Sequence, residues 1–74
     1  MKAMPGRPNK RECVERAIEL LRGVDGAEHV VRYLMEYGSV RAKEAAEMLH
    51  ELEQRDDDAR IARAYLDLVW RGEA

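Results

Sequence analysis

The stretch NKRECVERAIELLRG, residues 9–23, carries the clearest structural signal in this chain of 74 residues. Asn9 is a residue type that caps helices, and Glu12 stands three positions later, which is the spacing of a capping box. Apolar residues then recur at intervals of three and four, the period of a helix with one buried face. Gly23 follows as a left-handed stop. The pattern predicts a helix over residues 10–23 whose apolar stripe is formed by Cys13, Val14, Ala17, Ile18, Leu20 and Leu21.

A second segment repeats this pattern. Asp25 and Glu28 again have the capping-box spacing, and an apolar face with helical period follows them. Gly38 then supplies a stop. We therefore expect a second helix over residues 26–37.

Two further helices complete the prediction. Ser39 is a good cap for a third helix, rich in alanine, that runs to about residue 54. The three aspartates at residues 56–58 favour a fourth helix ending near Trp70, because carboxylates are stabilised at a helix N-terminus. No Gly or Pro separates the third and fourth segments, so one long helix is an alternative.

The expected fold is therefore all-α. It is a small bundle of four short helices, arranged as two helical hairpins, with a helix-turn-helix-like arrangement as one version of it. We assign residues 1–8 to a disordered basic arm and residues 9–74 to a single helical domain. A chain of this length holds one domain at most.

The material for a core is scarce. Ten of the 34 apolar residues are alanine and none is phenylalanine, so we expect either very regular helix packing or oligomerisation. The last helix is apolar on most sides and needs either a central place in the bundle or a second subunit. We expect a homodimer contact through Tyr65, Leu68, Val69 and Trp70.

Charge is unevenly distributed along the chain. The net charge is −2, but residues 1–11 hold four basic side chains and no acid, for a charge of +4. Residues 12–74 hold 9 basic and 15 acidic side chains, for a charge of −6. An arm of this sign can contact phosphates, whereas the body as a whole would be repelled by them.

Several function classes find no support. One cysteine, Cys13, cannot form an internal disulfide, which favours a reducing, cytoplasmic setting, and no apolar run is long enough for a signal or a membrane span. Besides this thiol, candidate catalytic groups are only Ser39, His29 and His50. A single Glu-x-x-His pair at Glu47 is too few ligands for a metal centre. We expect no enzymatic activity, no cofactor and no metal.

Three resemblances bear on partners. The segment PGRPNKR, residues 5–11, resembles the AT-hook, which lays arginine into the minor groove of A·T-rich DNA, and more loosely the leaders of some phage small terminase subunits. Residues 30–49, VVRYLMEYGSVRAKEAAEML, resemble the opening of bacterial helix-turn-helix regulators. Residues 57–65, DDARIARAY, followed by Arg71-Gly72, look like a segment of RecX-type regulators. The last resemblance implies a protein partner, the recombinase filament.

The function that we expect is regulatory or architectural DNA association. The basic side chains expected to contact DNA are Arg7, Lys10, Arg11, Arg41 and Lys43. The alternative is a helical adaptor that binds a protein through an aromatic surface at Tyr33, Tyr37 or Trp70, because aromatic residues near arginine make good anchors.

Overall fold

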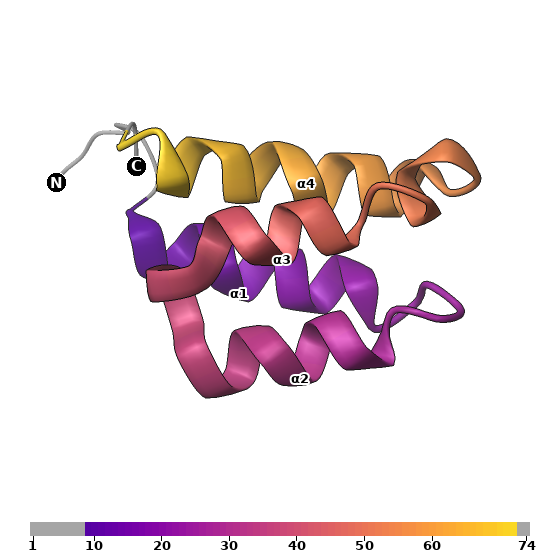
Figure 1. Cartoon of the computed structure of the whole chain (residues 1–74), viewed down its shortest axis with the longest axis horizontal. Helices are drawn as coiled ribbons and strands as arrows, with labels where there is room; N and C mark the ends of the chain where they lie inside the picture. The colour runs from indigo at the N-terminus through magenta and orange to yellow at the C-terminus, as the bar shows by residue number, and fades with distance from the viewer. Residues whose placement is uncertain (1–8, 73–74) are drawn as a thin grey trace, which may run out of the picture.

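The computed structural model describes residues 9–72, and these form a bundle of helices without a strand. The predicted all-α fold is confirmed, whereas the proposed arm at residues 1–8 lies outside the described residues. Successive helices run antiparallel, so that the bundle has two ends where the chain reverses (Figure 1). The elements are α1 (Lys10–Leu21), α2 (Glu28–Tyr37), the 3₁₀ turn η1 (Gly38–Arg41), α3 (Ala42–Met48), the 3₁₀ turn η2 (Leu52–Gln54) and α4 (Asp57–Trp70).

The four helices form two antiparallel pairs, α1 with α2 and α3 with α4. The closest packing joins the pairs, because α4 lies along α1 and also contacts α3, η1 and η2. In contrast, α2 lies at the edge of the bundle, where α1, η1 and α3 cover only its inner side (Figure 1). α1 therefore lies between α2 and α4, which form opposite edges of the bundle (Figure 1).

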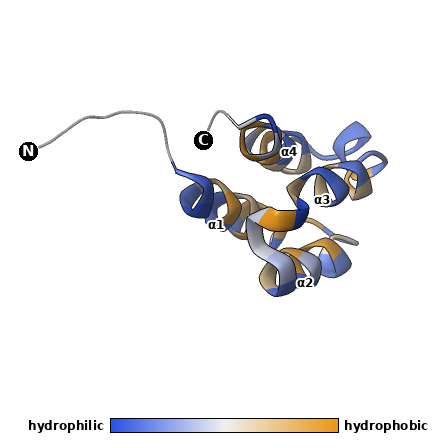
Figure 2. Cartoon of the chain, turned by 60° about the vertical axis from the view of Figure 1, so that its left-hand side comes forward, coloured by the Kyte–Doolittle hydropathy of each residue, from blue (hydrophilic) through white to orange (hydrophobic). Residues whose placement is uncertain are grey.

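The core is built from small side chains, with polar residues on the outer sides of the helices (Figure 2). Seven of its 17 buried apolar residues are alanines, and no polar or charged residue among those described is buried. Small side chains let helix backbones approach closely, which is how a chain with few large apolar residues still excludes water. The largest fully buried side chains are Leu21, Leu34, Leu49 and Leu66.

Two predicted helix starts are confirmed. The Asn9 Oδ1 accepts a hydrogen bond from the Glu12 N–H at 2.8 Å, and the Glu12 Oε1 accepts one from the Asn9 N–H at 3.2 Å, so the capping box is complete. At the start of α4, the Asp56 Oδ1 accepts a hydrogen bond from the Asp58 N–H at 2.9 Å. The three aspartates thus begin the helix as predicted.

The connection between α1 and α2 differs from the prediction. α1 ends at Leu21, and the residue with a left-handed backbone is Gly26, at φ +87°, not Gly23. Asp25 lies in the turn and does not cap α2, whose N-cap is Ala27 without a side-chain hydrogen bond. The reason is burial: the chain needs residues 22–27 to bring Val24, 4% exposed, into the core before it reverses.

The third helix is shorter than predicted. Ser39 lies within η1 and makes no cap, because Gly38 ends α2 at φ +59° and a 3₁₀ turn precedes α3. α3 ends at Met48, and η2 then brings Leu52 into the core. Asp56 is extended, at φ −138° and ψ 121°, which separates α3 from α4 and rules out one continuous helix.

The apolar breadth of α4 is largely satisfied within the chain. Val69 is 4% exposed and packs in the core, so it is unavailable for the predicted dimer contact. The reason is that α1 and α3 both cover this face of the helix. Tyr65 and Leu68 are half-buried, and Trp70 is 42% exposed. Within the described residues, no helix combines the length and apolar character needed to cross a membrane.

Candidate nucleic-acid interface

Basic side chains from three separate segments meet at one end of the bundle. α1 begins there, η1 and the start of α3 lie beside it, and α4 ends there (Figure 1). We call residues 9–11, 37–43 and 70–72 the basic end. These segments hold five cations and no carboxylate, for a segment charge of +5. Four carboxylates from adjacent positions contact them, those of Glu12, Glu15, Glu44 and Asp67. The cations are Lys10, Arg11, Arg41, Lys43 and Arg71.

The contacts of η1 hold this end together. η1 packs against α1, α2 and α4. Lys10 and Arg11 line one groove with Gly38 and Ser39, so the start of α1 lies next to the turn that leads to Arg41. Sequence reasoning placed the basic residues on separate segments, and the antiparallel topology is what joins them.

Four of the five side chains expected to contact DNA belong to the basic end, and Arg7 lies outside the described residues. The sequence missed Arg71. Its position after the last residue of α4 was visible, but only the packing of α4 beside α3 brings it near Lys43. Both cations lie over the Trp70 ring.

An aromatic pair lies at the α2 side of the basic end. The rings of Tyr33 and Tyr37 are 4.8 Å apart between centroids, with their planes tilted by 58°. The guanidinium of Arg41 lies 5.2 Å from the centroid of the Tyr37 ring, within the range of a cation–π contact. Tyr33 is half-buried, whereas Tyr37 is 40% exposed. The outer ring of the pair therefore faces solvent beside a cation.

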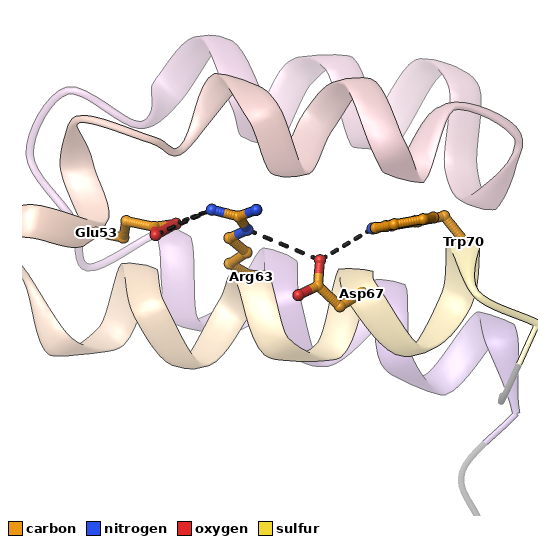
Figure 3. Close-up of polar contacts among 4 residues, drawn as sticks. All are labelled: Glu53, Arg63, Asp67 and Trp70. Carbon is orange, nitrogen blue, oxygen red and sulfur yellow. Dashed lines mark hydrogen bonds and ion pairs between the residues drawn. The ribbon is translucent and has the colours of Figure 1, made fainter.

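Trp70 occupies the matching position at the α4 side. The Lys43 Nζ lies 5.6 Å and the Arg71 guanidinium 5.7 Å from the centroid of its indole ring. Its Nε1–H donates a hydrogen bond to Asp67 Oδ1 at 2.9 Å (Figure 3). The polar edge of the ring is thus fixed to α4, while the ring as a whole remains 42% exposed.

A line of polar contacts along α4 leads to this tryptophan (Figure 3). The Arg63 Nη1 donates to both carboxylate oxygens of Glu53, at 3.0 and 2.8 Å, which ties η2 to α4. The Arg63 Nε lies 3.7 Å from Asp67 Oδ1 and makes no hydrogen bond within the described residues. The hydrogen bonds to Glu53 raise the pKa of Arg63 above its ordinary value. The Arg63 guanidinium therefore lies between Glu53 and the Asp67 carboxylate that accepts the hydrogen bond from Trp70.

Within residues 9–72, the cations of the basic end form only weak ion pairs. Arg11 lies 3.4 Å from a carboxylate oxygen of Glu15, and Arg41 lies 3.9 Å from one of Glu44; all four side chains are at least half exposed. Exposed pairs of this kind contribute about 0–1 kcal/mol. Lys10, Lys43 and Arg71 form no ion pair with the other residues of the range 9–72. All five cations can therefore turn to an external anion at little cost.

The opposite end of the bundle has the opposite sign. It is formed by the turn between α1 and α2 and by the segment from α3 to the start of α4 (Figure 1). Residues 22–28 and 49–60 hold seven carboxylates and three arginines, for a net charge of −4. The molecule therefore presents opposite charges at the two ends of the bundle.

The remaining candidate groups are structural or dispersed. Cys13 is fully buried, and burial raises the pKa of its thiol, to which the nearby Glu12 carboxylate adds. A thiol in this state is a poor nucleophile. His29 and His50 are exposed on different elements, and residues 9–72 contain no group of three side chains that could hold a metal ion.

One apolar strip is only partly covered. Leu20 of α1 lines a groove with Ile61 and Tyr65 of α4, and the other residues that line it are Arg16, Glu19, Gly23 and Asp58. Ile61 is 46% exposed, and sequence reasoning did not select it. The spacing of Ile61, Tyr65 and Leu68, at four and three residues, places all three on one side of the helix.

Comparisons with models of protein families, with curated proteins and with solved structures found no match for this chain. The chemistry of its own surface is therefore the ground for a functional inference. The feature that stands out on that surface is the basic end, where exposed aromatic rings lie among cations.

Proposed function

We propose that this protein is a small, non-enzymatic DNA-associated protein that contacts DNA through its basic end. The observation that carries the proposal is the convergence of five cations from three segments on one end of the bundle. Residues 1–8, which precede the basic end in the sequence, contain Lys2 and Arg7 and no acidic residue. A regulatory or architectural role in the cytoplasm fits this mode of binding.

The charge layout favours one orientation on a polyanion. The basic end attracts phosphates, while the net charge of −4 at the opposite end is repelled by them. The bundle should therefore meet DNA end-on. Five phosphate contacts predict that the logarithm of the binding constant falls with the logarithm of salt concentration with a slope of about −4.5 on duplex DNA.

The test is a salt titration of binding to a labelled duplex of about two helical turns, followed by fluorescence anisotropy. Replacing both Lys43 and Arg71 by Gln should reduce the slope by about 2 and weaken binding at low salt. The matched control replaces Arg55 and Arg60, at the opposite end, by Gln, and it should leave the slope unchanged. No binding at low salt, or an equal loss in both double variants, would refute the proposal.

A second candidate function is self-association through the apolar strip formed by Leu20, Ile61, Tyr65 and Leu68. The observation that favours it is the exposure of Ile61, 46%, which lines a groove between α1 and α4. The occupant we propose is a second copy of the chain, because a self-complementary apolar patch is the usual basis of a two-fold dimer. This version replaces Val69 and Trp70 of the predicted contact by Leu20 and Ile61.

Sedimentation equilibrium tests this dimer. Ile61→Arg should convert a dimer into a monomer, because it places a charge in the centre of the strip, whereas Met35→Arg on the exposed face of α2 should leave the dimer intact. A wild-type protein that sediments as a monomer at high concentration would exclude self-association.

A further inference from the structure

We infer that the basic end binds single-stranded DNA, with Tyr37 and Trp70 stacking on unpaired bases and the neighbouring cations contacting the phosphates. This inference rests on the proposed function, and it goes further by naming the form of the nucleic acid and the groups that read it. The evidence for it is the aromatic side chains of the basic end, because a site that binds phosphates alone does not need them.

Both rings are exposed to solvent. Tyr37 is 40% and Trp70 is 42% exposed, although the core of this chain is short of large apolar side chains. A ring at the surface that could have been used in the core offers a flat apolar face to a ligand. Bases stack on such faces irrespective of sequence, and a stacked base is a major part of the affinity for single strands.

Each ring lies beside at least one cation. Arg41 lies beside Tyr37, and both Lys43 and Arg71 lie beside Trp70. Arg41 and Lys43 are two residues apart, so the two rings flank one short cationic segment. Along a single strand, each base is followed by a phosphate, so rings and cations that lie side by side can bind both groups. A purely basic patch can bind the phosphates alone.

Neighbouring side chains hold both rings in position. Asp67 holds the indole N–H of Trp70 and is itself held near Arg63, while Tyr33 packs against the ring of Tyr37. Rings that are already oriented lose little conformational freedom when a base stacks on them. The rings are thus held in place, and a base that stacks on Trp70 would displace Lys43 or Arg71 from the ring toward the phosphates.

Duplex DNA fits this end less well. The faces of paired bases are hidden inside the stack, so neither ring can reach them. A protein helix that enters the major groove needs a basic face, but α3 has only seven residues and α4 begins with Asp57 and Asp58. On α1, the exposed positions carry both signs, with Lys10, Arg11 and Arg16 among Glu12, Glu15 and Glu19.

Trp70 is the only tryptophan in the chain, so its own fluorescence reports stacking. The experiment titrates the full-length protein with three ligands: oligothymidine of about 12 nucleotides, a duplex of equal length, and a single strand of abasic sites. The abasic strand keeps the phosphates and lacks the bases. We expect saturable quenching by oligothymidine alone, and tighter binding of it than of the other two ligands.

Variants identify the stacking residues. Tyr37→Leu should weaken oligothymidine binding about fivefold or more, because it removes one stacked base. Tyr37→Phe keeps the ring and should retain the affinity, and Met35→Leu is the control at an exposed apolar residue of α2 outside the basic end. Trp70→Leu, followed by anisotropy of a labelled strand, should give a loss similar to that of Tyr37→Leu. Equal helicity by circular dichroism establishes that each variant is folded.

The outcomes separate the two proposals. If the abasic strand or the duplex binds as tightly as oligothymidine, with the predicted salt dependence, the proposed function stands and the stacking inference is refuted. The inference also fails if Tyr37→Leu binds as well as Met35→Leu. If none of the three ligands binds at low salt, both proposals fail.

Discussion

Two isomeric side chains on α4 give the sharpest test of the packing. Leu66 is fully buried at the contact of α4 with the core, whereas Ile61 is 46% exposed on the apolar strip. Replacing either residue by alanine removes the same three carbon atoms from the same helix. The two variants therefore differ mainly in burial, and their free energies of unfolding should differ accordingly.

The magnitudes follow from the exposure. Removing three buried carbons from Leu66 costs about 2.4 kcal/mol of transfer free energy at about 0.8 kcal/mol each, and the cavity that remains raises the total to about 3–4 kcal/mol. For Ile61, the buried half of the side chain is worth about 1.3 kcal/mol, and the better helix propensity of alanine offsets about 0.4 kcal/mol of this. The expected loss is about 1 kcal/mol.

Urea unfolding followed by circular dichroism at 222 nm measures both losses. A domain of this size has a total stability of about 4–11 kcal/mol and an m-value of about 1 kcal/mol per molar urea. The midpoint should therefore fall by about 3 M for Leu66→Ala and by about 1 M for Ile61→Ala. Equal shifts would refute the assignment of Leu66 to the core and of Ile61 to the surface. A wild-type midpoint that rises with protein concentration, together with an Ile61→Ala midpoint that does not, would show that a second copy covers Ile61.

Three further predictions concern the polar line, the buried thiol and the first turn. Glu53→Gln should lower the free energy of unfolding, measured by chemical denaturation, by about 1–2 kcal/mol, because it removes the charge that accepts two hydrogen bonds from Arg63. An unchanged free energy of unfolding would show that these bonds do not tie η2 to α4. Because burial raises the pKa of Cys13, the unfolded chain ionises first, so stability should fall as the pH rises through the ordinary value of 9.0. Between pH 7 and 10, the free energy of unfolding should fall less in Cys13→Ala than in the wild-type protein. The same pH dependence in both proteins would contradict this. Gly26→Ala should lower the thermal midpoint, at a cost of about 1–2 kcal/mol, because φ is +87°. Gly23→Ala, whose new Cβ would meet only the Leu20 carbonyl oxygen at 3.7 Å, should be neutral.

The sequence was sufficient to predict the helices but not all of their boundaries. Hydrophobic period and side-chain caps are local signals, so the capping box at Asn9 and the aspartates before α4 were both predictable. The turns depend on which distant residues must be buried. Val24 and Leu52 enter the core from the two connections, and this requirement shortened α1 and α3.

The candidate site was predictable only in part. The sign of the charge identified Lys10, Arg11, Arg41 and Lys43, since each stands in a stretch that is locally basic. Arg71 was missed because its neighbours in space, Lys43 and the ring of Trp70, come together through the antiparallel packing of α3 and α4. The pairing of cations with exposed rings is likewise a tertiary feature, and no spacing in the sequence indicates it.

The antiparallel topology explains how an acidic chain acquires a basic surface. No described helix has a basic face, and the net charge of the whole chain is −2. The positive residues instead stand near the start of α1, the turn after α2 and the end of α4, and a chain that reverses direction at each connection brings these three points to the same end. The acidic turns gather at the other end by the same geometry. Any recognition of a polyanion by residues 9–72 must therefore use an end of the bundle, where rings and cations from different segments meet, and cannot use one helix laid along a groove.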